Sequence, residues 1–282
     1  MTRPITVGVD GSAESLAAVH WAAREAVRRG RSLRLVHAWE TADAGEHAPK
    51  ALDALRETAH ELAERHPSVP VSTERLDAAP VPSLVAEAAD AETLVLGSRG
   101  HGAIVGFLLG SVGQQVVAES ACPVVLVRAD DRAETEAAGR EIVVGQQGGP
   151  DDSGAALRFA FQTAAARGAT VRVVRAWSLP ALYSMSPGSM KLLDEAGGLE
   201  PYEKKALAEA LEPWQERFPD VPVIQDTEMG SAGEVLLSAA ARAQLAVVGR
   251  RAHRSAVGPR IGSVAHAVMH HAPCPVAVVP PA

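Results

Sequence analysis

Short apolar runs alternate with longer amphipathic segments along the whole chain of 282 residues. The apolar runs are bounded by glycine, proline or aspartate and are too short for helices, which is typical of buried strands. In the amphipathic segments, apolar residues recur at helical spacing, which predicts helices with one buried face. This regular alternation favours an α/β fold, in which helices cover both faces of a mostly parallel sheet.

The first half of the chain begins this pattern. The predicted strands span 5–9, 33–39, 70–76, 93–96 and 123–127, and the predicted helices span 15–29, 48–66, 82–89 and 112–120. On the first helix, a set of apolar residues recurs at helical spacing and is expected to face the core: Leu16, Val19, Ala23, Ala26 and Val27.

The second half repeats the order of the first. Its predicted strands span 142–144, 171–177, 223–226 and 245–248, and its predicted helices span 155–167, a segment ending near 218, and 233–241. We therefore expect two tandem domains, residues 1–130 and 139–282, here called the first and second repeat, with a charged linker at 129–140. The stretch 180–200 is rich in Pro, Gly, Ser and Met and is interpreted as a mobile flap.

The clearest chemical signal is the stretch GSRGHGAIVGFLLGS, Gly97 to Ser111, between a predicted strand and a predicted helix. Its glycines Gly97, Gly100 and Gly110 would let the backbone approach a ligand closely and adopt positive φ. The first amides of a helix have no internal partners and carry partial positive charge, so the stretch suits a phosphate group. Ser111 would cap the helix or donate a hydrogen bond to the anion. An equally long stretch, GRRAHRSAVGPRIGS, occupies 249–263 of the second repeat.

Asp10 follows the first predicted strand. In a doubly wound sheet, ligands bind at the carboxyl ends of the strands where the winding reverses. If the first strand lies beside the fourth, Asp10 and Gly97 face one crevice, and Asp10 can bond adenine or ribose while the glycine stretch holds phosphates. Asp10 can also serve as the cap of the first helix, and the two roles are compatible.

Composition narrows the classes of function. The formal net charge of −7 favours neither nucleic-acid binding nor a membrane-surface role. The apolar runs fall short of the ~20 residues of a membrane span, and the start MTRPITVGVD has no signal-peptide form. The two cysteines, Cys122 and Cys274, lack zinc spacing and are expected to be buried small residues. We expect a cytoplasmic protein without a metal site of its own.

These residues resemble the universal stress protein family. Its nucleotide-binding members carry the motif G-x2-G-x9-G-[ST], which Gly97, Gly100, Gly110 and Ser111 match with the spacing intact. The start V-G-V-D-G-S at 7–12 and the Cys-Pro-Val that ends each repeat also fit the family. The resemblance covers essentially the whole chain, as two tandem copies. It implies that each copy forms a five-stranded parallel sheet of strand order 3-2-1-4-5 with helices on both faces.

The resemblance also implies ATP binding, with Mg²⁺ on the phosphates. Asp10 would contact the nucleoside, and the helix-terminal amides would hold the phosphates. The candidate binding residues are Asp10, Ala38, Leu96, Gly97, Arg99, Gly100, Gly110, Ser111 and Val112 in the first repeat, with Gly249, Gly262 and Ser263 in the second. Because family members pair through their last strand, the two repeats are expected to form an internal pseudo-dimer through 124–127 and 276–279, and a homodimer is a further expectation.

The second repeat departs from the motif. Ala252 stands where the second glycine should be, and its methyl group would cost roughly 1–2 kcal/mol if that turn needs positive φ. The start VGQQGGPDDS is one residue longer, so either Gln147 or Gly148 takes the place of Asp10. The second stretch is also richer in cations, which either bind an anion or form a solvated face: Arg250, Arg251, His253, Arg254 and Arg260. We expect ATP in the first repeat and weaker or different binding in the second.

The leading hypothesis is a non-enzymatic, ATP-binding stress-response or regulatory module that acts with a protein partner. A slow ATPase is the first alternative, although Val112 stands where a P-loop would have lysine, and no carboxylate pair is placed for base catalysis. A partner-binding protein that has lost nucleotide binding is the second alternative. His37 ends an apolar strand and is expected to be a satisfied core histidine.

Overall fold

The computed structural model describes residues 2–38, 47–98, 111–130, 141–149, 152–179, 198–251 and 261–282, with the backbone alone for 47–52 and 54. Most of the expected linker and of the expected flap, as well as Arg99, Gly100, Gly110 and Ala252, lie outside these residues.

Both repeats alternate strands and helices as the pattern predicts, with the ends of elements shifted by a few residues. The first repeat contains β1 (Ile5–Gly8), α1 (Ala13–Arg29), β2 (Leu33–Ala38), α2 (His47–Arg65), β3 (Val71–Leu76), α3 (Pro80–Asp90), β4 (Thr93–Ser98), α4 (Ser111–Glu119) and β5 (Val124–Arg128). The second contains β6 (Ile142–Gly145), α5 (Gly154–Arg167), β7 (Val171–Trp177), α8 (Glu200–Arg217), β8 (Val223–Met229), α9 (Ala232–Ala240), β9 (Leu245–Gly249), α10 (Ser263–His271) and β10 (Val276–Val279).

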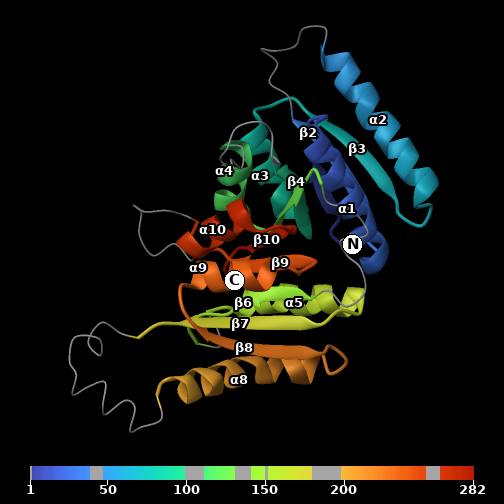
Figure 1. Cartoon of the computed structure of the whole chain (residues 1–282). Coiled ribbons are helices and arrows are strands. Elements are labelled where there is room, and N and C mark those ends of the chain that lie inside the picture. Colours follow the sequence, from blue (N-terminus) through green and yellow to red (C-terminus); the bar gives the residue numbers. More distant parts are fainter. Residues whose placement is uncertain are drawn as a thin grey trace.

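The strands form one sheet of ten, in the order β3-β2-β1-β4-β5-β10-β9-β6-β7-β8 (Figure 1). Within each repeat the strands are parallel and follow the expected order 3-2-1-4-5, which confirms the doubly wound α/β fold. The last strands of the two repeats pair antiparallel, with Ala277 opposite Val125. An approximate two-fold axis therefore passes through this strand pair and makes each position in one repeat equivalent to a position in the other.

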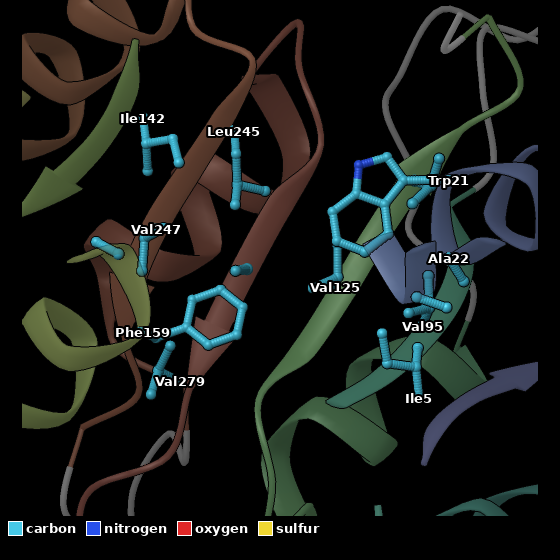
Figure 2. Packing of buried hydrophobic residues seen from close by; sticks show 14 of the residues in the cluster. Ile5, Trp21, Ala22, Val95, Val125, Ile142, Phe159, Leu245, Val247 and Val279 are labelled. Atoms are coloured by element: carbon cyan, nitrogen blue, oxygen red, sulfur yellow. The ribbon is translucent and has the colours of Figure 1, made fainter. Parts of the chain in front are cut away.

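Helices cover both faces of the sheet. Buried residues of α1, α2, α5 and α8 form one core with the sheet, and buried residues of α3, α4, α9 and α10 form the other. Each core contains residues from both repeats. In Figure 2, Trp21 and Val125 of the first repeat and Phe159 and Val279 of the second belong to the same cluster. The two repeats are therefore packed as one body, joined through the sheet and through both cores.

The buried face of α1 is broader than its apolar pattern predicts. Val19 and Ala23 are buried as expected, but Leu16 is 39% exposed and Val27 is 46% exposed. Trp21 and the charged Glu25 are buried instead. The expectation was therefore wrong for Leu16 and Val27, and α1 also packs against α5, which adds Trp21 and Glu25 to its buried residues.

The hydrogen bonds at the ends of β1 and β6 define which residues are equivalent. The amide of Val9 donates to the carbonyl of Val36, and the amide of Gln146 donates to the carbonyl of Val174, both at 2.9 Å. Gln146 is therefore the counterpart of Val9, and Gln147 is the counterpart of Asp10. This resolves the alternative between Gln147 and Gly148 that the sequence left open.

Gly97 lies under the first turn of α1. A Cβ at Gly97 would stand 2.5 Å from the carbonyl carbon of Glu14 and 2.6 Å from the amide nitrogen of Ser15. Its backbone is not in the positive-φ region, so that expectation was wrong for Gly97. A Cβ at the equivalent Gly249 would meet nothing within 4 Å. Glycine at 97 is thus required by close helix-to-strand packing, a requirement that the second repeat has lost at 249.

This difference predicts unequal effects of one substitution at two equivalent positions. Gly97→Ala should lower the free energy of unfolding by about 1–3 kcal/mol, because backbone atoms of α1 must move to admit the methyl group. Gly249→Ala should change it by less than about 0.5 kcal/mol. Urea unfolding of both variants measures the two values, and equal losses would contradict this account of Gly97.

Candidate nucleotide-binding site

Asp10 lies where the winding of the sheet reverses. It follows β1, which pairs with β2 on one side and β4 on the other, with Gly8 opposite Leu96. The side chain of Asp10 is exposed, and its Oδ1 accepts hydrogen bonds from the amide of Ser12 at 3.0 Å and the hydroxyl of Ser12 at 2.5 Å. The structure thus places a carboxylate beside the carboxyl ends of β1 and β4, as the sequence predicts.

Ser12, not Asp10, caps α1. The Ser12 hydroxyl oxygen accepts from the amide of Ser15 at 3.1 Å, while Asp10 orients Ser12 from the preceding turn. Partial burial alone would raise the pKa of Asp10, but hydrogen bonds from Ser12 and Ser15 outweigh it and hold that pKa below its usual value. Asp10 is therefore a preorganised, ionised acceptor whose other oxygen, Oδ2, can accept from ribose or adenine.

The helix after the glycine stretch begins at Ser111. Ser111 is exposed, and Val112 is 37% exposed. The first turn of α4 carries no acidic side chain that would repel an anion from its amides. In the second repeat Gly262 is the cap of α10, with φ −64° and ψ 156°, and the exposed Ser263 is the first helical residue. Ser111 is likewise the first residue of α4, so the expectation that Ser111 caps the helix was wrong, and its hydrogen bond to an anion stays a prediction.

Leu96 and Ala38, both predicted to bind the nucleotide, are placed differently. The side chain of Leu96 is only 5% exposed and lies in the core between the sheet and α3, so its backbone is the part that can face a ligand. Ala38 is half-buried at the end of β2, opposite Leu76. Beside it, the half-buried His37 contacts the Val9 carbonyl through Nδ1 at 2.6 Å, so this ring nitrogen has a partner within the protein, as expected. The ends of β1, β2 and β4 thus surround Asp10.

In the second repeat the same place holds a network of the protein's own side chains. Arg175 is the counterpart of His37, because Val174 corresponds to Val36. Its Nη1 donates to Gln146 Oε1 at 2.6 Å and to the Gly148 carbonyl at 3.0 Å, and its Nε donates to Glu203 Oε2 at 2.6 Å. Arg175 therefore ties the end of β7 to the loop after β6 and to α8.

Sequence reasoning did not single out Arg175. The signal was present, since Ala176-Trp177 aligns with Ala38-Trp39 and puts an arginine at the position of His37. Gln147, exposed at the position of Asp10, brings a neutral amide in place of a carboxylate. Its backbone amide donates to Ser153 Oγ at 3.0 Å, just as the Asp10 amide donates to Ser15 Oγ at 3.4 Å.

One member of the cationic cluster in the second glycine stretch has a defined contact. Arg250 donates through Nη1 to the Val117 carbonyl of α4 at 2.9 Å, so it binds the other repeat rather than forming only a solvated face. Arg251 is exposed, and the remaining members lie outside the described residues, as do Arg99, Gly100 and Gly110.

The described residues also bear on the expectations about metal ions, membrane spans and cysteines. Among them, no group of three or more His, Cys, Asp or Glu side chains is arranged to hold a metal ion. No helix in the described part of the chain is long and apolar enough to cross a membrane. Cys122 and Cys274 are buried, as expected, and neither forms a disulfide; burial raises the pKa of the Cys122 thiol.

Known proteins match the chain over its length. A universal stress protein of Mycobacterium tuberculosis is 33% identical over 293 residues, covering 97% of this chain and 96% of that protein. A solved universal stress protein from Archaeoglobus fulgidus covers 99% of this chain and 98% of that chain, with a TM-score of 0.72 and 17% identity, which shows the shared fold. A universal stress protein solved in complex with cAMP is 29% identical and covers 45% of this chain and 98% of that chain, with a TM-score of 0.37; the ligand is a property of that protein.

The family model of the universal stress protein family matches residues 1–128 and again residues 139–280. Together with the repeated strand order, this means that the chain belongs to the universal stress protein family and carries the family's domain twice.

Proposed function

We propose that the first repeat binds one adenine nucleotide, ATP, and that the protein acts as a nucleotide-dependent stress-response or regulatory module. The observation that carries the proposal is the position of Asp10. It is an exposed carboxylate, oriented by Ser12, at the switch point of the sheet and on the same sheet edge as the end of β4. The motif formed by Gly97, Gly100, Gly110 and Ser111 starts at that strand end.

Each part of the ligand would meet suitable chemistry. The carboxylate of Asp10 accepts from ribose hydroxyls or from the adenine amine, a charge-assisted bond that water replaces poorly. The unpaired amides at the start of α4 attract the negative phosphates. Mg²⁺ would bind through the phosphates, since such ions often keep several waters and few protein ligands.

The second repeat is proposed to bind ATP more weakly or not in the same way. Gln147 lacks the charge of Asp10, and Arg175 is held by Gln146 and Glu203 at the place where the first repeat has His37. A nucleoside that binds at this place would have to displace hydrogen bonds of 2.6 Å that the protein already makes.

We further propose a non-enzymatic role. Val112 follows the Gly-Ser pair where a P-loop places lysine. A slow ATPase stays the alternative, and a partner-binding protein without nucleotide is a third reading. In the leading, non-enzymatic proposal, a regulatory protein partner would recognise the nucleotide-bound state of the first repeat.

Substitution at Asp10 tests the site. Asp10→Asn keeps an oxygen that can accept from Ser12, so the turn before α1 is preserved while the charge is lost. We expect the dissociation constant for Mg-ATP to rise about tenfold or more, as for the loss of a hydrogen bond to a charged group. Gln147→Ala, at the equivalent position, should leave it unchanged. Isothermal titration calorimetry measures both.

Two calorimetric outcomes would contradict the proposal. Equal affinities for the parent chain and Asp10→Asn would remove Asp10 from the site. If the parent chain neither binds ATP nor gains thermal stability from it, the reading without nucleotide is favoured instead.

Turnover separates a binding module from a slow ATPase. With excess Mg-ATP, we expect less than one phosphate released per chain over hours, because the described part of the site offers no paired acid and base. Phosphate release should be followed by a coupled assay, with Asp10→Asn in parallel. Multiple turnovers that Asp10→Asn abolishes would make the protein an enzyme.

A further inference from the structure

A buried carboxylate joins the two repeats at the ends of α1 and α5. Glu25 of α1 has a side chain only 2% exposed. Its Oε1 lies 2.5 Å from Nε of Arg29 in the same helix, and its Oε2 lies 2.9 Å from Nη2 of Arg167 in the second repeat. Arg28 of the same helix lies 3.5 Å from Oε2 through Nη1. One carboxylate therefore pairs with arginines from both sides of the interface.

Arg29 and Arg167 are equivalent under the approximate two-fold axis. Arg29 ends α1 before Gly30, and Arg167 ends α5 before Gly168. Each reaches across the interface to an aromatic ring, Arg29 to Phe159 at 5.5 Å and Arg167 to Trp21 at 5.3 Å. These crossed contacts bury a positive charge from each repeat against the other.

The residues that face the arginines are not equivalent in charge. Counting back from the helix ends, the counterpart of Glu25 is Thr163, whose hydroxyl accepts from Arg29 Nη2 at 2.7 Å. The second difference lies just before β4 and β9. Arg29 also pairs with Glu92 at 3.2 Å, whereas Arg167 donates to the neutral Gln244 at 2.9 Å. The first repeat thus supplies the carboxylates, and the second supplies neutral oxygens.

We propose that charge makes the contact between α1 and α5 specific for two unlike repeats. The α5 face of the second repeat fits the α1 face of the first repeat, which carries the carboxylates, and does not fit a second copy of itself. Two second repeats paired in the same geometry would bury two Arg167 side chains facing Thr163 and Gln244, with no carboxylate from these positions. A buried charge that loses its partner is strongly destabilising, whereas a paired one adds little net stability. Glu25 therefore acts mainly by selecting the partner.

The protonation state of Glu25 agrees with this role. Burial alone would raise its pKa, but Arg167 and Arg29, with Arg28 further along α1, outweigh burial and hold the pKa below its usual value. The carboxylate is thus ionised at neutral pH, and its contribution to stability is lost only as the pH falls through that lowered pKa.

A charge swap across the interface tests the proposal in the full chain. Glu25→Thr leaves both arginines without this carboxylate and should lower Tm by about 5–10 °C. Adding Thr163→Glu returns one carboxylate from the other side, where it faces Arg29 and stands one turn before Arg167 in its own helix. We expect the double variant to recover Tm to within about 2 °C of the parent chain. Glu209→Thr, in the exposed ion pair of Glu209 with Lys205 on α8, controls for helix propensity.

The charge swap shows whether Glu25 acts across the interface between the repeats or only within its own helix, α1. If Glu25 only stabilises α1, Thr163→Glu cannot compensate, and the double variant will stay as unstable as Glu25→Thr; that result overturns the proposal. A Glu25→Thr chain as stable as the Glu209→Thr control overturns it as well. Should Glu25→Thr fail to fold, recovery of a folded, cooperatively melting double variant still supports the proposal, and its failure to fold contradicts it.

Discussion

The antiparallel pairing of β5 with β10 is the constraint on which the rest of the structure depends. Without it, each repeat would expose β5 or β10 as an edge strand, and an exposed apolar edge invites aggregation. With it, two parallel sheets become one, and α1 and α5 come together over the junction (Figure 1). The buried contacts of Arg29, Arg167 and Glu25 form only because this strand pair brings the two helix ends together.

The same pairing imposes one frame on both repeats, within which they differ at a few equivalent positions. Gln147 stands at the position of Asp10, and Arg175 at the position of His37, so the proposed nucleotide-binding chemistry lies in the first repeat. Glu25 has become Thr163, so the charge that joins the repeats also comes from the first. The two repeats therefore share one fold, and they differ in chemistry through single side chains at equivalent positions.

Much of the fold could be predicted from the sequence, because alternation and the internal repeat are properties of local pattern. The strand order followed from the family resemblance, and the register confirmed it. The buried face of α1 could not be predicted in the same way. Glu25 looks like a surface residue until Arg167, far along the chain, is brought beside it, while Leu16 and Val27 look like core residues and are exposed.

The candidate site could likewise be predicted only in part. The place of Asp10 followed from strand order, but the role of Gly97 did not, because its neighbours belong to α1 rather than to the glycine stretch. The role of Arg175 could not be predicted, because its partner Glu203 lies 28 residues further along the chain, on α8.

The central claim is that the chain binds one adenine nucleotide and that this nucleotide lies in the first of its two similar repeats. Native mass spectrometry of the full chain in a modest excess of Mg-ATP tests it most directly, since it counts ligands per chain. The account predicts a dominant species of one chain with one ATP. A dominant species with two ATP per chain would contradict the assigned difference between the repeats, and a chain that stays without ATP would contradict the site itself.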